Sequence, residues 1–111
     1  MVSYLIRWKI KPGQEVGFET AWLELTKLIY KHCGSLGSRL HVGDDGVYYA
    51  YAQWPSFESR ETSEIGAEDL TEANKFRAQM QGATLELLPL IKLNICQDFL
   101  KQEPNPNRKE N

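Results

Sequence analysis

The sequence is short of cysteine, of long apolar runs and of targeting signals. Its 111 residues include two cysteines, Cys33 and Cys96, which lie far apart and form no C-x-x-C pair. In a reducing compartment such isolated cysteines are typical of small buried thiols rather than of a disulfide. No apolar run approaches the roughly 20 residues of a membrane-spanning helix, and the first residues lack a signal-peptide cleavage pattern. We therefore expect a cytoplasmic protein without a membrane partner.

The sequence also lacks clustered charge and the common motifs of metal and phosphate sites. The formal net charge is -2, and the 13 basic residues are scattered. Nucleic acids and anionic membranes both require a basic face, so neither is an expected partner. There is no His, Cys, Asp or Glu cluster at metal-ligand spacing, no glycine-rich phosphate loop and no nucleophile elbow. The sequence thus predicts no metal, and its length fits one domain.

The first half of the sequence predicts a strand, a helix and a hairpin. Apolar residues alternate from Tyr4 to Ile10, which is the period of a strand, and Lys11-Pro12-Gly13 ends it. A helical stripe follows, with Gly34 as its stop. The stripe consists of Phe18, Trp22, Leu25 and Ile29. Strands over residues 36–42 and 47–54 are joined by a tight turn at 43–46.

The second half predicts two helices and an interrupted apolar segment. Ser56 can cap a short helix over residues 57–63, and after a loop a second amphipathic helix covers about 68–81, closed by Gly82. The apolar stretch 84–99 contains Pro89, which marks a sheet edge or a bulge. Residues 101–111 have no apolar residue other than two prolines. We expect a domain over residues 1–100 and a disordered or extended tail that is dispensable for folding.

This order of elements, β-α-β-β-α-β, is the α+β plan of the ferredoxin-like fold. The helices cover one face of an antiparallel sheet and leave the other face uncovered. Provisionally, that second face carries Leu5, Tyr48 and Ala50 beside Arg7, Arg39 and His41. A homodimer that packs two sheets together is the simplest way to bury it.

Several of these segments together resemble the antibiotic biosynthesis monooxygenase superfamily. The resemblance covers about residues 2–97 and rests on Lys11-Pro12-Gly13 before a Trp-bearing helix and on residues 34–59, GSLGSRLHVGDDGVYYAYAQWPSFES. It implies a dimeric α+β barrel. Named members of the superfamily include cofactor-independent oxygenases of aromatic polyketides and quinols, and haem-degrading enzymes.

The haem-degrading branch is a poor match to this sequence. That branch uses an Asn on the first strand, a Trp on the short helix and a His on the helix that follows. In this sequence the first strand has no Asn, the short helix has no Trp and the helix that follows has no His. The resemblance therefore implies a monooxygenase that needs no cofactor and acts on a small aromatic or quinol-type molecule. The alternative is a non-catalytic member of the same fold that binds a small hydrophobic ligand or acts in a stress response.

Oxygenation without a cofactor requires a flat ring to be held, a proton to be removed and an anion to be stabilised. The candidates for the aromatic walls of the pocket are Trp8, Tyr49, Tyr51 and Trp54. The catalytic candidates are His41 as a base, with Arg39, Asn74 and Arg77 as partners of the anion.

Each of these candidates also has a purely structural interpretation. Trp8 and Trp54 can equally be core residues, and His41 is more often an interface or surface histidine. Arg39 can pair with an acid across a dimer. Trp22 fits the core, His32 fits a helix C-terminus, and Arg60 fits a solvated helix face beside Glu61 and Glu64.

The strand over residues 47–54 has distinct faces. Tyr49, Tyr51 and Gln53 share one side, and the opposite side carries Tyr48, Ala50, Ala52 and Trp54. We expect one face to pack the dimer. The other is expected to line a pocket beneath the helices, near Trp8 and the second amphipathic helix.

Overall fold

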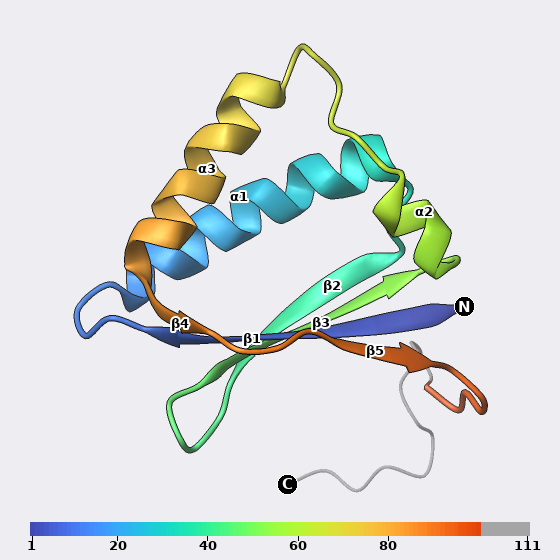
Figure 1. Ribbon diagram of the computed structural model, residues 1–111, viewed down its shortest axis with the longest axis horizontal. Helices are drawn as coiled ribbons and strands as arrows, with labels where there is room; N and C mark the ends of the chain where they lie inside the picture. Colours follow the sequence, from blue (N-terminus) through green and yellow to red (C-terminus); the bar gives the residue numbers. More distant parts are fainter. Residues whose placement is uncertain (101–111) are drawn as a thin grey trace, which may run out of the picture.

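A computed structural model, which describes residues 1–100, shows one antiparallel sheet with helices on one face (Figure 1). The strands are β1 (Val2–Ile10), β2 (Gly37–Val42), β3 (Tyr48–Trp54), β4 (Thr84–Leu87) and β5 (Ile91–Asn94). The helices are α1 (Glu15–Cys33), α2 (Phe57–Glu61) and α3 (Leu70–Ala83). The sheet order is β2-β3-β1-β4, with β5 also paired to β1. The expected α+β ferredoxin-like fold is confirmed.

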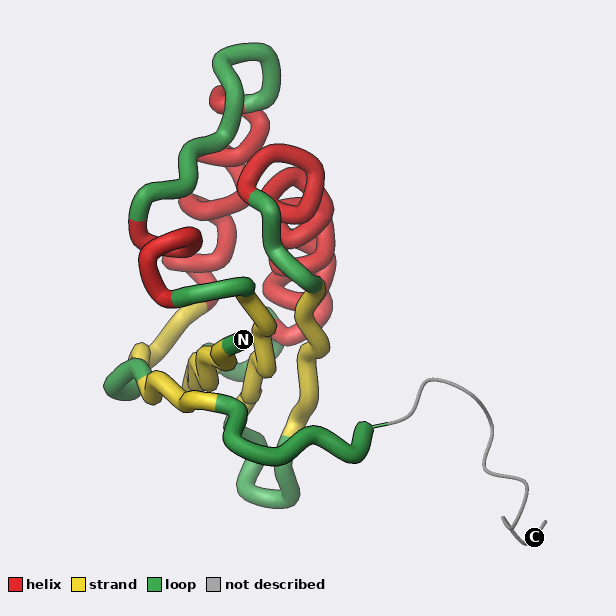
Figure 2. Tube along the Cα trace, turned by 90° about the vertical axis from the view of Figure 1, so that its right-hand side faces the viewer, coloured by secondary structure: helices red, strands yellow, loops and turns green. Residues whose placement is uncertain are grey.

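Local sequence signals account for two of the helices. α1 ends at Gly34, whose φ of 74° is the left-handed conformation that glycine adopts without a Cβ clash. α2 begins with a capping box, in which Ser56 and Ser59 each satisfy a backbone N–H of the other. Figure 2 shows the helices gathered in a layer above the strands. The helix layer and the sheet thus face each other across the interior of the domain.

The predicted stop of the second long helix at Gly82 is wrong. α3 continues through Gly82 to Ala83, and its C-cap is Thr84 in an extended conformation. Unlike Gly34, Gly82 does not have a positive φ. The Thr84 hydroxyl donates a hydrogen bond to the carbonyl oxygen of Met80 at 2.7 Å, so a side chain satisfies one of the last carbonyls of the helix.

Pro89 divides the last apolar stretch into two short strands on one edge of β1. β4 pairs with the Trp8–Ile10 end of β1, and β5 pairs with the Val2–Leu5 end. Between them, the Arg7 guanidinium donates to the carbonyl oxygen of Pro89 at 3.1 Å. The interruption agrees with the predicted sheet edge or bulge, because proline has no N–H to give to a ladder.

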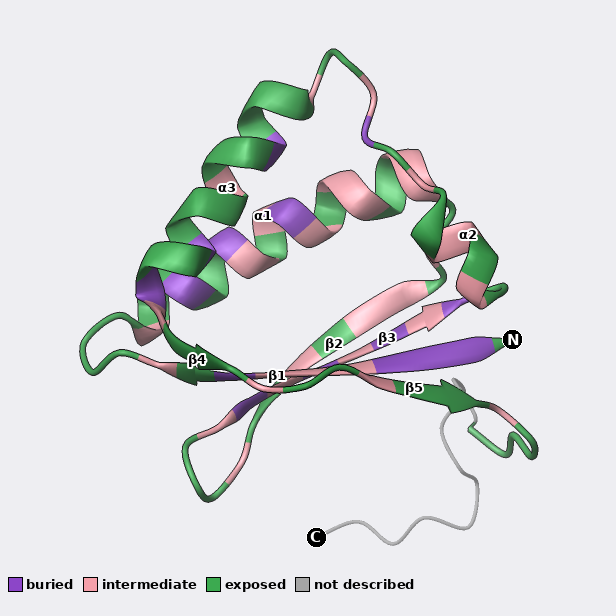
Figure 3. Cartoon of the chain, viewed as in Figure 1, coloured by how far each residue is buried: buried purple, intermediate pink, exposed green. Residues whose placement is uncertain are grey.

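The core lies between the sheet and the helices, and Figure 3 shows burial along β1 and β3 beneath them. The provisional placement of Tyr48 and Ala50 on the uncovered face is wrong. They are 6% and 0% exposed and pack in the core with Phe18 of α1. Ala52 and Trp54 lie on the same face of β3 and are also buried, so this is the face that the helices cover.

The uncovered face carries the residues that alternate with these. Tyr49, Tyr51 and Gln53 point there, opposite Arg7, Leu5 and Ser3 of β1. No helix among the described residues is long and apolar enough to cross a membrane. The expectation for the tail concerns residues 101–111, which lie outside the described residues.

Candidate functional site

A cavity of about 340 Å³ lies between the inner face of the sheet and the helices. Its size is within the range of small-molecule pockets, which is roughly 300–1,000 Å³. Most of its lining is apolar or aromatic. The apolar lining residues are Ile6, Trp8, Trp22, Leu25, Ile29, Ala52, Trp54, Met80 and Leu87, and the polar ones are Thr26, Ser35, Ser38, Arg60 and Arg77.

Three tryptophans form aromatic walls of this cavity. Trp8 and Trp54 are 9% and 4% exposed, and Trp22 packs against the same core. Trp8 also meets the Phe18 ring edge-on, with the ring centroids 5.2 Å apart. Because packing fixes these rings, they offer a preformed surface to a flat ligand.

Two guanidinium groups line the cavity from different helices. Arg77 of α3 donates from Nη1 to Oδ1 of Asn74 at 3.1 Å. The Arg60 guanidinium of α2 lies over the Tyr4 ring, 4.2 Å from its centroid. Both arginines also line an adjoining cavity of about 430 Å³. The site therefore combines an apolar interior with positive charge where two cavities meet.

Among residues 1–100, the cavity lining contains no proton-accepting side chain of the usual kinds. None of its lining residues is a His, Tyr, Asp or Glu. The predicted base, His41, lies on β2, and its Nδ1 is 3.2 Å from the carbonyl oxygen of Tyr49. A reaction in this cavity thus requires a ligand that ionises readily or one that arrives as an anion.

The structure brings some of the predicted site residues together and separates others. Trp8, Trp54 and Arg77 line the inner cavity. Asn74 does not line it but accepts a hydrogen bond from Arg77. A separate hollow of about 520 Å³ lies on the uncovered face of the sheet. That hollow contains Arg39, His41 and Tyr51, whereas Tyr49 lines neither of them and donates its hydroxyl to Asp45 at 3.1 Å.

Trp22 and Arg60 are among the cavity residues that were not predicted as site residues. Trp22 sits on the helical stripe that marks core residues, and a tryptophan in such a stripe also fits a cavity wall. Arg60 fits a solvated helix face by its sequence, but in the structure it is half-buried. No local sequence signal reports the tilt of α2 that turns Arg60 inward.

Tyr48 forms the strongest polar contact at the other end of the inner face. Its hydroxyl donates to Oε2 of Glu19 at 2.6 Å. This hydrogen bond, followed by burial and by the negative charge of Glu19, raises the pKa of Tyr48 to about 12. Tyr48 is therefore a hydrogen-bond donor at neutral pH and does not act as a base.

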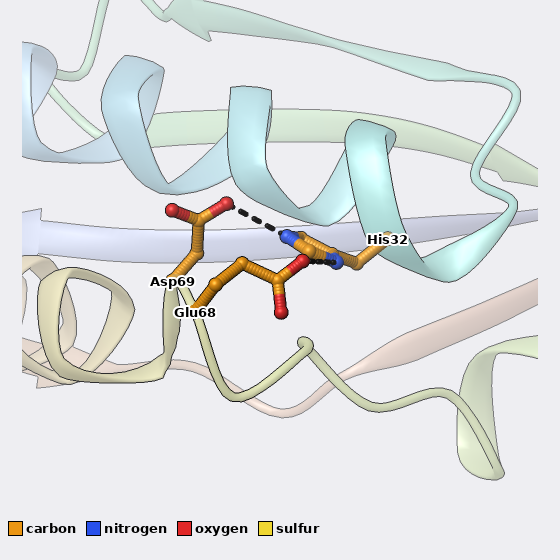
Figure 4. Close-up of side chains that lie close together, drawn as sticks. All are labelled: His32, Glu68 and Asp69. Atoms are coloured by element: carbon orange, nitrogen blue, oxygen red, sulfur yellow. Dashed lines mark hydrogen bonds and ion pairs between the residues drawn. The ribbon is translucent and has the colours of Figure 1, made fainter.

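A second cluster joins the end of α1 to the start of α3 (Figure 4). In it, ligand atoms of His32, Glu68 and Asp69 lie within 4.8 Å of one another. Nε2 of His32 is 2.8 Å from Oδ2 of Asp69, and Nδ1 is 3.2 Å from the backbone N of Gly66, which donates to it. The sequence spacing did not predict this cluster because its members come from separate segments.

Its hydrogen bonds make the cluster a structural clamp rather than a metal centre. Both ring nitrogens of His32 already have partners. Nζ of Lys31 lies 2.8 Å from the same Asp69 oxygen and would repel a cation there. The hydrogen bond from Lys31, followed by that from His32, lowers the pKa of Asp69. His32 therefore does more than complement the helix end, since it ties two helices together.

Comparison with known proteins supports the fold assignment. No protein-family model matches the sequence, and no curated protein matches it significantly. Solved structures do match. A protein of Bordetella bronchiseptica, provisionally named an antibiotic biosynthesis monooxygenase, is 16% identical with a TM-score of 0.68, covering 89% of this chain and 97% of its own. A Deinococcus radiodurans protein with the same provisional name is 8% identical, with a TM-score of 0.67 and coverage of 93% and 100%.

A third similar structure has a named activity. A mutant of SnoaB, a cofactor-independent oxygenase from Streptomyces nogalater, is 12% identical with a TM-score of 0.67, covering 90% of this chain and 97% of its own. The structural neighbours of this chain are thus antibiotic biosynthesis monooxygenase proteins. At these identities the likeness shows a shared fold, and the chemistry has to be argued from the cavity.

Proposed function

We propose that this protein is a cofactor-independent monooxygenase of a small aromatic or quinol-type molecule. The observation that supports this most is the tryptophan-walled cavity with two arginines, in a fold shared with the oxygenase SnoaB. The tryptophans hold a flat ring by stacking. The arginines stabilise the anion that forms when the ring loses a proton.

The absence of a base from the cavity lining shapes the mechanism. A nearby guanidinium lowers the pKa of a phenol or enol, so the substrate ionises and its proton passes to solvent. The electron-rich anion then reduces oxygen directly. For a CH2 group of an anthrone-type ring, O2 supplies one oxygen atom to a new C=O bond. The other oxygen atom leaves with both hydrogens as water, so the substrate provides all the electrons.

Oxygen consumption with anthrone-type and quinol substrates tests this proposal. We expect Trp54→Phe and Arg77→Gln each to lower the rate by about tenfold or more, because they remove ring contact and anion stabilisation. Lys27→Gln removes a positive charge from an exposed part of α1 and is the control, which should leave the rate unchanged. Wild-type rates in both cavity variants would contradict the proposal.

A non-catalytic, ligand-binding role is the second candidate. It is favoured by the same cavity lining, which has aromatic walls but no His, Tyr, Asp or Glu among the described residues. The two roles differ in one measurement. Tight binding of aromatic ligands without oxygen consumption, across readily ionised substrates, would support the binding role and reject the oxygenase.

The uncovered face of the sheet supports the proposal of a homodimer. The helices protect only the inner face, and the outer hollow includes Leu5 and Leu36 beside polar residues such as Arg39. A second copy buries this face without a new structural element. Light scattering at micromolar concentration should report a dimer and should report a monomer for Leu5→Asp. Leu23→Asp, at an exposed position of α1, is the control, and a monomeric wild type would overturn the proposal.

A further inference from the structure

We propose that Arg60 and Arg77 form an anion subsite that selects aromatic ligands bearing a carboxylate. The inference uses the cavity of the proposed function and names the class of molecule that it accepts. It also gives a specificity role to Arg60.

The first observation is that neither arginine has an acidic partner within the part of the chain that the structure describes. Within residues 1–100, no carboxylate oxygen lies within the 4.0 Å ion-pair distance of either guanidinium. The lysines at positions 9, 27, 31 and 92 each have a carboxylate partner at 2.8 to 3.3 Å. The positive charges at the cavity are therefore left without the acidic partners that these surface lysines have.

The second observation is that a half-buried Arg60 and an exposed Arg77 border the same two cavities. Both guanidiniums line the inner cavity and the adjoining one. Like charges that border one cavity repel each other. A bound carboxylate removes the repulsion and accepts charge-assisted hydrogen bonds, which guanidinium forms in a bidentate geometry.

The arrangement also orients the ligand. Trp8 and Trp22 line the inner cavity and not the adjoining one, whereas Trp54 and both arginines line both cavities. A ring stacked among the tryptophans would thus direct its carboxylate toward the boundary. Contacts on the protein side hold both arginines, since Arg77 bonds to Asn74 and Arg60 lies over Tyr4.

One acidic residue limits the charge of the ligand. Glu64 lines the adjoining cavity but not the inner one, and it is exposed. Its negative charge opposes a second anionic group beyond the first. The subsite is therefore suited to a ligand with one carboxylate on an aromatic ring.

The experiment compares the binding of 2-naphthoate and 2-naphthol, which share a ring but differ in charge at neutral pH. We expect wild type to bind naphthoate at least about tenfold more tightly, in titrations followed by tryptophan fluorescence. Arg60→Gln and Arg77→Gln should each weaken naphthoate binding about tenfold and leave naphthol binding nearly unchanged. Arg60→Lys keeps the charge and should retain part of the affinity, and Glu64→Gln should strengthen naphthoate binding.

Lys27→Gln is the control for a general loss of positive charge, and melting temperatures confirm that each variant is folded. Equal affinity of wild type for the two probes, or equal weakening of both by Arg60→Gln, would overturn the subsite. Different outcomes would reject the subsite and the proposed oxygenase activity. Selective naphthoate binding with no oxygen consumption by any hydroxylated naphthoate would retain the subsite and reject the oxygenase. Oxygen consumption with quinols by a wild type that binds the two probes equally would do the reverse.

Discussion

Tyr48 and Tyr49 are neighbours in the sequence with similar side-chain partners but opposite surroundings. Tyr48 faces the helices and donates to Glu19, and Tyr49 faces away from them and donates to Asp45. In each case the hydrogen bond to a carboxylate is the main cause that raises the tyrosine pKa. A strand can therefore place two tyrosines on opposite faces and still satisfy both hydroxyls.

The raised pKa of Tyr48 predicts a loss of stability in alkali. Its folded-state pKa of about 12 lies above the ordinary value of 10.0, so the contribution of the hydrogen bond is complete below pH 10.0 and is lost as the pH rises toward 12. Urea unfolding should show a shallower decline over this range for Tyr48→Phe than for wild type. Glu19→Gln removes the negative partner and should lower the Tyr48 pKa, which an absorbance titration of the phenol measures. An unchanged titration in this variant would contradict the assignment.

At individual residues, the sequence predicts the site only where a local pattern reports the direction of the side chain. Strand alternation predicts that Trp54 and Tyr51 lie on opposite faces, and the structure agrees. The same alternation means that Tyr49 and Tyr51 cannot line the same pocket wall as Trp54. Arg60 could not be found in this way, because its inward position depends on how α2 packs against β3 and the Tyr4 ring.

At the scale of elements, two glycines near helix ends have different roles. Gly34 terminates α1 with a positive φ, whereas Gly82 is an ordinary helical residue one position before the end of α3. The sequence pattern is the same in both cases, an apolar stripe followed by glycine. What separates them is the next segment, since the chain must reach β4 directly from α3, and an extended Thr84 provides that exit.

Alanine substitutions at these two glycines should therefore have opposite effects on stability. An added Cβ at Gly82 meets no atom within 4 Å, so Gly82→Ala should raise the free energy of unfolding by roughly 0.5–1 kcal/mol through helix propensity. Gly34→Ala forces a left-handed conformation and should lower it by about 1 kcal/mol. Chemical denaturation measures both. Destabilisation by Gly82→Ala would show that this position needs glycine.

The main elements could be predicted because hydrophobic period and turn chemistry agree in each of them. The period-2 pattern of β1, the helical stripe of α1 and the Asp-Gly turn all point to one structure. In the sequence, Pro89 was the only sign that the last apolar stretch divides into two strands. The pairing of β4 and β5 with the two ends of β1 depends on contacts between residues distant in the sequence.

At the scale of the whole molecule, the His32 clamp connects the C-terminal end of α1 to the loop that starts α3. Asp69 is its centre, because it accepts hydrogen bonds from both Lys31 and His32. The adjoining cavity includes Cys33 and Leu70, the residues next to the clamp on either side. The clamp therefore also supports one wall of the candidate site.

The lowered pKa of Asp69 predicts how the clamp responds to acid. A carboxylate with a depressed folded-state pKa contributes stability above its ordinary value of 3.8 and loses it as the pH falls through the folded-state pKa. Asp69→Asn should therefore melt at a lower temperature than wild type at neutral pH, and the difference should shrink in strong acid. Glu24→Gln, which breaks only an exposed ion pair on α1, should have little effect at either pH. A pH-independent difference for Asp69→Asn would contradict this role of the charge.

The pairing of β1 with β4 and β5 has a consequence for synthesis on the ribosome. β1 is made early, and β3 can cover one of its edges, but the other edge stays open until residues 84–94 have emerged. During that interval the nascent chain presents a row of unpaired N–H and C=O groups beside apolar side chains. Such an edge recruits strands from neighbouring chains. Completion of residues 84–94 closes this edge and ends the exposure.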